Sequence, residues 1–413
     1  MGRIASRFGR VEPRRRARAL VLGLLAGLPR TNCWTIAEHT GAAGPEPLQH
    51  LLSRAVWDHD GVRDDLRNYV VEHLGHADAV LVVDETGDLK KGTHTVGVQR
   101  QYTGTAGRIE NAQVGVYLTY ATADAHAFID RALYVPKSWT DDPDRCTAAG
   151  IPEETGFATK PELAVQMIMR ALDADTPAAW VAGDEVYGND PGLRADLHSR
   201  GVGYVLGVRR DHRIATHAGT FRAIDLAVTL PASVWQTHSC GPGSKGHRYY
   251  AWALVAIDDD TISGHPRLLI RRNGRTGELA FYRTWAPTPV PLAALITVAG
   301  RRWKVEENFQ AGKGLAALDE HQVRRWTSWH RWTILAMLAH AFLAVTAAAE
   351  RAAPGTRTEL IALTCNEIRH LFTALLHRVN QDAGHLLRWS RWRRRHQTQA
   401  RTSHYRRRAL DPP

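Results

Sequence analysis

Two short apolar runs, each of which stops at an aspartate, constrain the fold more than any other feature of this chain. The first is AVLVVDET, which closes at Asp84, and the second is AAWVAGDEVYG, which closes at Asp184. Four to six residues of Ala, Val, Leu and Trp, followed by an acid and turn residues, are typical of a buried strand that ends in a functional loop. An acid at such a strand end lies at a sheet edge, where a ligand can reach it. The two runs therefore predict a sheet core with carboxylates at its edge.

A third motif, RRWKVEENFQAGKG, contains Arg302, Glu306 and Lys313 just after Gly300. Spacings of four and seven residues place these three side chains on roughly one face of a helix. A carboxylate between two cations suits a phosphate-bearing substrate with a metal nearby. A solvated helix with paired charges has the same pattern, so this motif alone does not decide. Glu307 is also acidic, but Glu306 is the one in step with both cations.

Together, Asp84, Asp184 and Glu306 would bring three carboxylates from two strands and a helix to one place. Carboxylates with few other ligands form a site for hard cations, and Mg²⁺ prefers this sparse oxygen ligation. Two such ions about 4 Å apart can stabilise both the attacking and the leaving oxygen of an in-line phosphoryl displacement. We therefore predict that these three residues are the metal ligands of a phosphoryl-transfer site.

The chain resembles the DDE transposases of bacterial insertion sequences, a ribonuclease-H-like family. Three blocks carry the resemblance: VVDETGDLKKGTHTVGVQRQYTGTAGRIENAQVGVYLTY, WVAGDEVYG, and RRWKVEENFQAGKG running into LDEHQVRRWTSWHRWTILAMLAHAFL. The last block is similar to a signature in which Tyr, Arg, Glu and Lys recur at set spacings. Arg302, Glu306 and Lys313 match it, whereas Ala299 takes the place of the tyrosine. This departure leaves the three carboxylates untouched and concerns only the DNA contact that a tyrosine would make.

The resemblance implies an α/β fold: a ribonuclease-H-like mixed-sheet core with a β-rich insertion and an N-terminal helical domain. It implies that Asp84, Asp184 and Glu306 hold two Mg²⁺ ions, for which Mn²⁺ can substitute, and that Arg302 and Lys313 bind DNA. The expected activity is DNA strand cleavage and strand transfer at the ends of an insertion sequence. The expected partners are double-stranded DNA, as terminal repeats and target, and a second copy of the chain on that DNA, with no membrane.

Two other functions remain open from the sequence. One is a ribonuclease-H-like nuclease that hydrolyses nucleic acid without joining it, and the other is a domesticated protein that binds DNA and no longer cleaves. The basic tails and the long insertion argue against the first, because synapsis of two ends needs more DNA contact than hydrolysis. The presence of all three carboxylates argues against the second.

The composition divides the 413 residues into five parts. We expect a basic arm with a helical, possibly DNA-binding domain, the first part of the core, a β-rich insertion, the second part of the core with the catalytic helix and buried helices, and a basic tail; these span residues 1–75, 76–211, 212–290, 291–387 and 388–413. Within the first part, CWTIAEHTG and PEPLQHLLSRAVW fit either a helix-turn-helix or a plain helical bundle. In the insertion, Arg271, Arg272 and Arg275 form either a DNA contact or a surface turn.

The net charge of +11 is concentrated in the two tails. Residues 1–18 carry +6 and residues 388–408 carry +9, so the remainder of the chain is at −4. Such tails suit a polyanion, because neutralised phosphates release counterions; a solvated arm is the alternative. Trp389 and Trp392 in the second tail favour nucleic acid, because indole rings stack on bases. Four widely separated cysteines fit a reducing cytoplasm, here at the bacterial nucleoid, and argue against a zinc cluster or disulfides.

One apolar stretch, TILAMLAHAFLAVTAAA at residues 333–349, is just long enough to span a bilayer. It carries His340 and is rich in alanine, so we predict a buried helix behind the active site. Trp326, Trp329 and Trp332 precede this stretch at intervals of three residues. Their spacing favours core packing over a base-stacking platform.

Overall fold

The computed structural model describes residues 1–243, 246–258, 263–353, 362–376 and 383–410. The chain opens with a helical region, as predicted, in which Asn32 caps one helix with a capping box and Asp58 caps another. Its elements are η1 (Ala5–Arg7), α1 (Val11–Leu25), α2 (Cys33–His39), α3 (Glu46–Ser53) and α4 (His59–Leu74). The apolar side of α3 packs against α1 and α13 (Trp326–Ala352). This packing is compatible with both a helix-turn-helix and a bundle, so both interpretations stay open.

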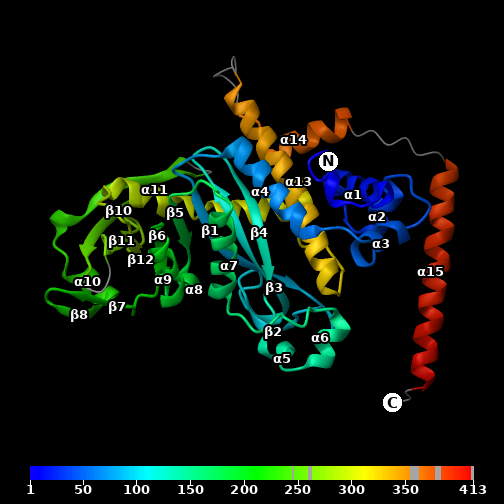
Figure 1. Cartoon of the computed structure of the whole chain (residues 1–413), viewed down its shortest axis with the longest axis horizontal. Helices are drawn as coiled ribbons and strands as arrows, with labels where there is room; N and C mark the ends of the chain where they lie inside the picture. The colour runs from blue at the N-terminus through cyan, green and yellow to red at the C-terminus, as the bar shows by residue number, and fades with distance from the viewer. Residues whose placement is uncertain (244–245, 259–262, 354–361, 377–382, 411–413) are drawn as a thin grey trace.

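A mixed sheet follows (Figure 1). Strands β4, β3, β1, β5 and β6 lie side by side; β3 is antiparallel to both β4 and β1, whereas β1, β5 and β6 are parallel. This is the predicted ribonuclease-H-like core. Its strands and helices are β1 (Val80–Leu89), β2 (Gln99–Thr103), β3 (Arg108–Ala121), β4 (His126–Leu133), α5 (Lys137–Thr140), α6 (Pro143–Ala149), α7 (Lys160–Asp173), β5 (Trp180–Gly183), α8 (Glu185–Gly188), α9 (Pro191–Ser199) and β6 (Gly203–Val208).

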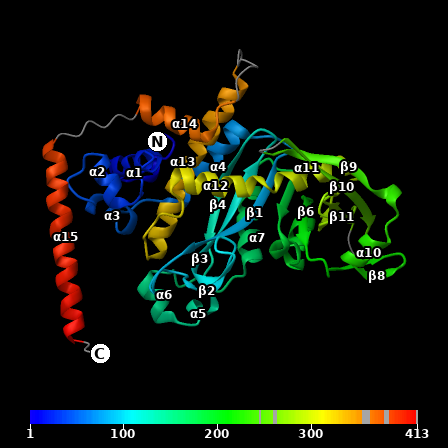
Figure 2. The ribbon, with the colours of Figure 1, turned by 180° about the vertical axis from the view of Figure 1, so that it is seen from behind.

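Helices cover the two faces of this sheet because neighbouring residues of β1 point to opposite sides. Leu81 and Val83 pack with residues of α7, which begins with a capping box at Thr159. Val80 and Val82 pack with residues of α11 (Leu292–Arg301). Figure 1 shows α7 in front of the sheet, and the reverse view in Figure 2 shows α11 and α12 (Lys304–Ala316) in front of it. The helix that carries Glu306 therefore lies on the α11 face.

The region predicted as an insertion holds β7 (Arg213–Thr216), β8 (Gly219–Arg222), α10 (Ala223–Thr229), η2 (Ala232–Val234), β9 (Gln236–Gly243), β10 (Gly246–Ala256), β11 (Arg267–Arg272) and β12 (Leu279–Trp285). Strand β12 pairs with β6, so β9 to β12 extend the core sheet, while β7 and β8 pair with each other. The Arg271 and Arg272 guanidiniums stack on Tyr250 and Trp235 respectively. The division into five parts stays a prediction, and one continuous sheet runs through two of those parts, residues 76–211 and 212–290.

Two local predictions need correction. The run HTVGVQRQY, residues 94–102, predicts a strand over its whole length, but the strand begins only at Gln99, because Gly97 has a left-handed backbone (φ 71°) that ends extended structure before it. The run from Arg302 to Lys313 is not one continuous helix. Arg302 and Trp303 join α11 to α12 through a tighter turn, in which the Val305 and Glu306 amides donate to the carbonyls three residues back.

The long helix α13 lies in the protein core, as predicted. Among the described residues it is the one helix long and apolar enough to cross a membrane, and 72% of its most apolar window is buried inside the protein. Trp329 and Trp332 are each 1% exposed, which confirms core packing for most of the tryptophan stripe. Beyond α13 come α14 (Cys365–Leu371) and a π-helical turn (Phe372–Leu376).

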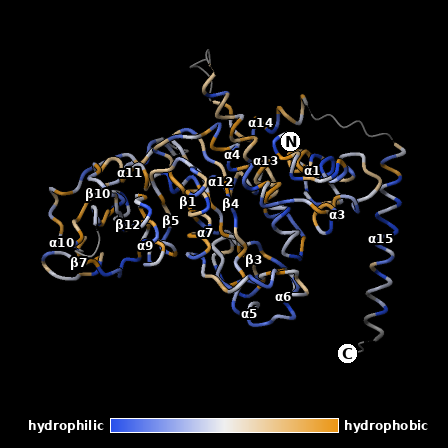
Figure 3. Tube along the Cα trace, viewed as in Figure 1, coloured by the Kyte–Doolittle hydropathy of each residue, from blue (hydrophilic) through white to orange (hydrophobic). Residues whose placement is uncertain are grey.

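The basic tail forms a helix, α15 (Ala383–Leu410), that stands beside the body (Figures 1 and 2). Its first turns dock on α2. The Trp389 indole donates to the Ala42 carbonyl at 2.9 Å, and Arg393 pairs with Glu38 at 2.6 Å. Trp392 packs edge-on against Trp34. Hydropathy colouring contrasts the apolar stretches of α13 with the hydrophilic α15 (Figure 3).

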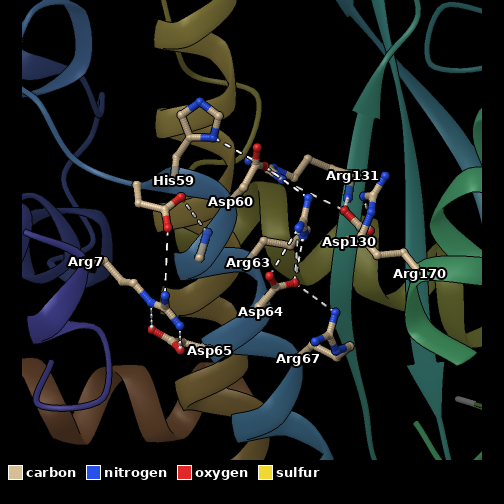
Figure 4. A network of polar contacts seen from close by, with 12 residues as sticks. Arg7, His59, Asp60, Arg63, Asp64, Asp65, Arg67, Asp130, Arg131 and Arg170 are labelled. Atoms are coloured by element: carbon tan, nitrogen blue, oxygen red, sulfur yellow. Dashed lines mark hydrogen bonds and ion pairs between the residues drawn. The ribbon is translucent and has the colours of Figure 1, made fainter. Parts of the chain in front are cut away.

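A buried ionic network joins the helical region to the sheet (Figure 4). Arg131 of β4 is 1% exposed at its side chain and lies 3.6 Å from Asp60 of α4 and 3.9 Å from Asp130. Arg170 of α7 donates to Asp130 at 2.7 Å. Because each buried charge has an opposite partner, the network fixes α4 and α7 against the same strand.

Candidate active site

The two aspartates come together through the pairing of β1 with β5. The parallel register aligns Val82 with Ala182, so Asp84 and Asp184 are each two residues further along neighbouring strands. Neighbouring strands lie about 4.8 Å apart, which brings the two aspartates level at one end of the parallel pair. This is the juxtaposition that the sequence predicted from the two apolar runs.

A tight turn after β5 holds Asp184 in place. Its carboxylate caps α8 by accepting from the Val186 amide at 2.8 Å. The turn packs so closely on β6 that a Cβ on Gly188 would overlap the Gly207 carbonyl. Position 188 must therefore be glycine for the turn to pack against β6. This packing fixes where Asp184 lies along the neighbouring strand β1.

Glu306 reaches the aspartates through Arg302. The Arg302 guanidinium lies 3.6 Å from Asp84 Oδ2 and 3.5 Å from Glu306 Oε1. The Asp84 side chain is 17% exposed, whereas that of Glu306 is 47% exposed at the rim of the site. Asp84 and Asp184 thus lie side by side at the strand ends, and Arg302 links Glu306 to Asp84 on the same face of the sheet.

The surroundings of all three acids oppose ionisation. Burial, and then the charge of Asp184, raises the pKa of Asp84 to about 7, against the opposing effect of Arg302. Burial and then the charge of Glu85 raise the pKa of Asp184. Burial also raises the pKa of Glu306, against the charges of Arg302 and Arg248. A cluster of desolvated, mutually repelling carboxylates favours the binding of a cation.

The adjacent glutamates differ in their contacts. Glu307 lies 3.2 Å from His126 Nε2 and 2.9 Å from Lys304 Nζ, and the hydrogen bond from His126, the largest cause, lowers its pKa to about 2. Glu306 instead faces Arg302. The assignment of Glu306 rather than Glu307 as a ligand stays a prediction, and these contacts support it.

Lys313 lies two helical turns beyond Glu306 on α12. Lys313 is close enough to Lys90 for the two charges to repel each other. Burial lowers the pKa of Lys90, Asp88 and Asp319 raise it, and the charge of Lys313 lowers it more weakly. Lys313 therefore belongs to a charged group near the end of β1 rather than to the immediate surroundings of Asp84. A role for Lys313 at the scissile bond stays a prediction.

A second group of residues, which is not among the predicted site residues, lies beneath the acids. Glu85 points to the α7 face and accepts hydrogen bonds from Lys160 Nζ and Tyr187 Oη, each at 2.6 Å. Its amide donates to Asp84 at 2.8 Å. These contacts tie α7 and α8 to β1 directly below the aspartates. Only the doublet Asp84–Glu85 hinted at it, because alternation sends one acid to each face of the strand.

The donor set fits a hard divalent ion. Three carboxylates supply oxygens, which Mg²⁺ and Mn²⁺ prefer, and the raised pKa values show that their charge is poorly compensated by the protein. Within the part of the chain that the structure describes, no three His, Cys, Asp or Glu side chains already stand close enough together to hold an ion. Binding would therefore require Glu306 to approach the aspartates and Arg302 to withdraw.

Comparison with known proteins adds independent evidence. Residues 3–222 match the sequence profile of a family described as DDE superfamily endonuclease. The matched region covers more than half of the chain and contains both aspartates, but it ends before Glu306.

A curated relative described as a probable transposase for insertion sequence element IS701, from Microchaete diplosiphon, is 26% identical over 196 residues. That alignment covers 47% of this chain and 49% of the relative, so it spans about half the length of each. Among solved structures, a piggyBac transposase synaptic complex with hairpin DNA aligns with 87% of this chain and 70% of its own, at 10% identity and a TM-score of 0.44.

Proposed function

Because the chain belongs to the DDE superfamily endonucleases, we propose that it is a transposase that cleaves DNA strands and transfers them at the ends of an insertion sequence. The observation that carries this proposal is the position of Asp84 and Asp184 on neighbouring parallel strands, with Glu306 linked to Asp84 through Arg302. The half-length similarity to a probable insertion-sequence transposase supports it.

Family membership implies dependence on a divalent metal. We propose that Asp84, Asp184 and Glu306 hold two Mg²⁺ ions and that Mn²⁺ can replace them. Bound ions of this kind activate the attacking hydroxyl or water and stabilise the leaving oxygen of an in-line displacement. The protein's own contribution is to hold the acids on a stiff sheet and to keep them partly dry, which strengthens electrostatic interactions.

Arg302 has two roles in this proposal. Before substrate binds, it supplies the counter-charge that keeps Asp84 and Glu306 together. When the site fills, its guanidinium turns to the phosphate beside the scissile bond, where two parallel N–H groups match two phosphate oxygens. Lys313, further along α12, would contact a more distant phosphate of the same DNA.

The partner is double-stranded DNA, first as element ends and then as target. The N-terminal arginines and α15 would grip its backbone without reading sequence, since contacts with phosphates give salt-sensitive, sequence-independent affinity. Joining two ends requires two active sites, so we propose a homodimer on DNA. The protein would act in the bacterial cytoplasm, at the nucleoid.

The test is cleavage of a plasmid that carries the gene with its own flanking DNA, in Mg²⁺ and in Mn²⁺, by the wild type and by Asp184→Ala. The expected result is metal-dependent breaks at fixed flanking positions, with joined products, that disappear in the variant. Breaks without any joined product would identify a nuclease instead. A wild type that binds the plasmid and leaves it intact in both metals would refute the enzymatic proposal.

A further inference from the structure

A cationic cavity lies where the β9–β10 hairpin meets the catalytic helices. Its volume is about 330 Å³. The residues that line it include Thr122, His247, Arg248, Arg301 and Lys304. The lining includes three permanent cations and a histidine but no carboxylate residue. A cavity of this composition favours an anion.

Close packing of backbone defines the cavity. A Cβ on Gly300 would overlap the carbonyl oxygen of Cys240, so α11 lies directly against β9. Arg248 spans the same junction: its Nη2 donates to the Gly300 carbonyl at 3.4 Å, and its guanidinium lies 5.5 Å from the centre of the Trp303 ring. The cavity is therefore a fixed feature of the fold.

The cations of the cavity are only partly neutralised. Arg248 Nε is buried and has no hydrogen-bond partner among the described residues. Arg301 donates to the backbone carbonyl of Asp78, which is a neutral acceptor, although the Asp78 and Asp124 charges also act on it. Lys304 is paired with Glu307 at 2.9 Å. Two guanidiniums thus keep donor capacity for a ligand, and guanidinium matches phosphate oxygens in pairs.

The cavity lies on the same face of the sheet as the acids. Arg301 lines the cavity and contacts the Asp78 carbonyl, whereas the next residue, Arg302, contacts Asp84 in the candidate active site. Arg248 is close enough for its charge to act on Glu306. Val80 of β1 lies beside the turn at Thr122, which lines the cavity. Asp84 is four residues further along the same strand, so at about 3.3 Å per residue it lies about 13 Å from Val80. A few nucleotides, at about 3.4 Å rise each, span this distance.

We propose that this cavity binds a backbone phosphate of the DNA strand being cut, a few nucleotides from the scissile bond, and that Arg248 and Arg301 are its main ligands. The inference rests on the proposed function and deepens it by assigning a second phosphate site to the junction between the insertion and the catalytic helices. Arg248 and Arg301 are positioning residues, since they fix the path of the strand and do not touch the reacting atoms.

The test measures DNA binding by fluorescence anisotropy in EDTA over a series of salt concentrations. The probe is a duplex with the gene's own flanking sequence. The variants are Arg248→Gln, Arg301→Gln and Arg248→Lys. The matched control is Arg200→Gln, which removes the same charge from an exposed pair with Asp173 near the end of α9. Thermal melting of each variant reports on folding.

Arg248→Gln and Arg301→Gln should each lower affinity about tenfold, as for the loss of a charged hydrogen bond. Each should reduce the slope of log affinity against log salt by about one. Arg248→Lys should restore the slope, and Arg200→Gln should match the wild type. Unchanged slopes in both glutamine variants would overturn the inference, as would lower melting temperatures without rescue by lysine. If the wild type neither binds nor cleaves DNA, the proposed function itself fails.

Discussion

Replacing Asp84 by Asn should stabilise the fold while abolishing cleavage, and the stabilisation should depend on pH. Burial, together with the charge of Asp184, raises the pKa of Asp84 from 3.8 to about 7. Between these two values the folded protein keeps a proton on this carboxyl that the unfolded chain has released. Stability therefore falls as the pH rises through this range and levels off above it, because the folded state binds more protons than the unfolded state.

The magnitude follows from the two pKa values. One pKa unit corresponds to about 1.4 kcal/mol, so a rise of about three units costs about 4 kcal/mol at pH 8. Little of this cost is removed by solvent screening, since the Asp84 side chain is 17% exposed. Asn has nearly the same shape and is neutral at every pH, so the variant should escape the cost without leaving a cavity.

The assay is urea unfolding in EDTA at pH 4 and pH 8 for the wild type, Asp84→Asn and the control Asp196→Asn, which changes an exposed aspartate of α9. EDTA is needed because a divalent ion would itself stabilise the ionised acids. The free energy of unfolding of Asp84→Asn should exceed that of the wild type by about 4 kcal/mol at pH 8 and equal it at pH 4. That of Asp196→Asn should equal the wild-type value at both pH values. Equal free energies of unfolding for Asp84→Asn and wild type at pH 8 would refute the electrostatic argument.

Three further predictions concern the site and its support. Glu306→Gln should abolish plasmid cleavage, whereas Glu307→Gln should retain it and lower the melting temperature, because Glu307 is held by structural contacts; the opposite pattern would exchange their roles. Affinity for Mn²⁺, measured by calorimetry, should rise up to about tenfold per pH unit below pH 7 and level off above it, since Asp84 must lose its proton; a flat profile from pH 6 to 8 would contradict this. Asp130→Ala should cost about 3–5 kcal/mol in urea unfolding, because it leaves the buried Arg131 without its neighbouring carboxylate; a loss below about 1 kcal/mol would show that the network is dispensable.

The sequence was sufficient to predict the sheet and its two aspartates because that information is local. A run of apolar residues that stops at Asp84 or at Asp184 specifies both a buried strand and the position of its end. The same holds for α13, in which apolar residues occupy all sides and leave no face for water. The two runs predict that the aspartates meet, but neither run specifies the parallel register that brings them level, since strand pairing joins segments that are far apart in the chain.

Other features depend on contacts that have no local pattern. The turn at Arg302 interrupts a spacing that looked continuous, and it places the guanidinium between Asp84 and Glu306. Helix α15 carries nine arginines and no acid over residues 388–408, so its composition suggested only a charged tail. Their place in a basic tail favours base stacking for Trp389 and Trp392, whereas in the structure Trp389 is buried and docks the helix on the N-terminal region.

The cationic cavity could not be predicted from the sequence for the same reason. Its residues connect the β-rich insertion to the helices of the candidate active site. Strand β12 pairs with β6, which in turn pairs with the strand that leads to Asp184. Helix α11 lies on β9 at Gly300 and continues into the turn of Arg302. The hydrogen-bonded sheet and this helix therefore fix Arg248 relative to the acids from two directions. In the proposed function, a DNA strand must therefore adjust to the fixed distance between Arg248 and the acids, because the sheet cannot readily move these side chains to fit the DNA.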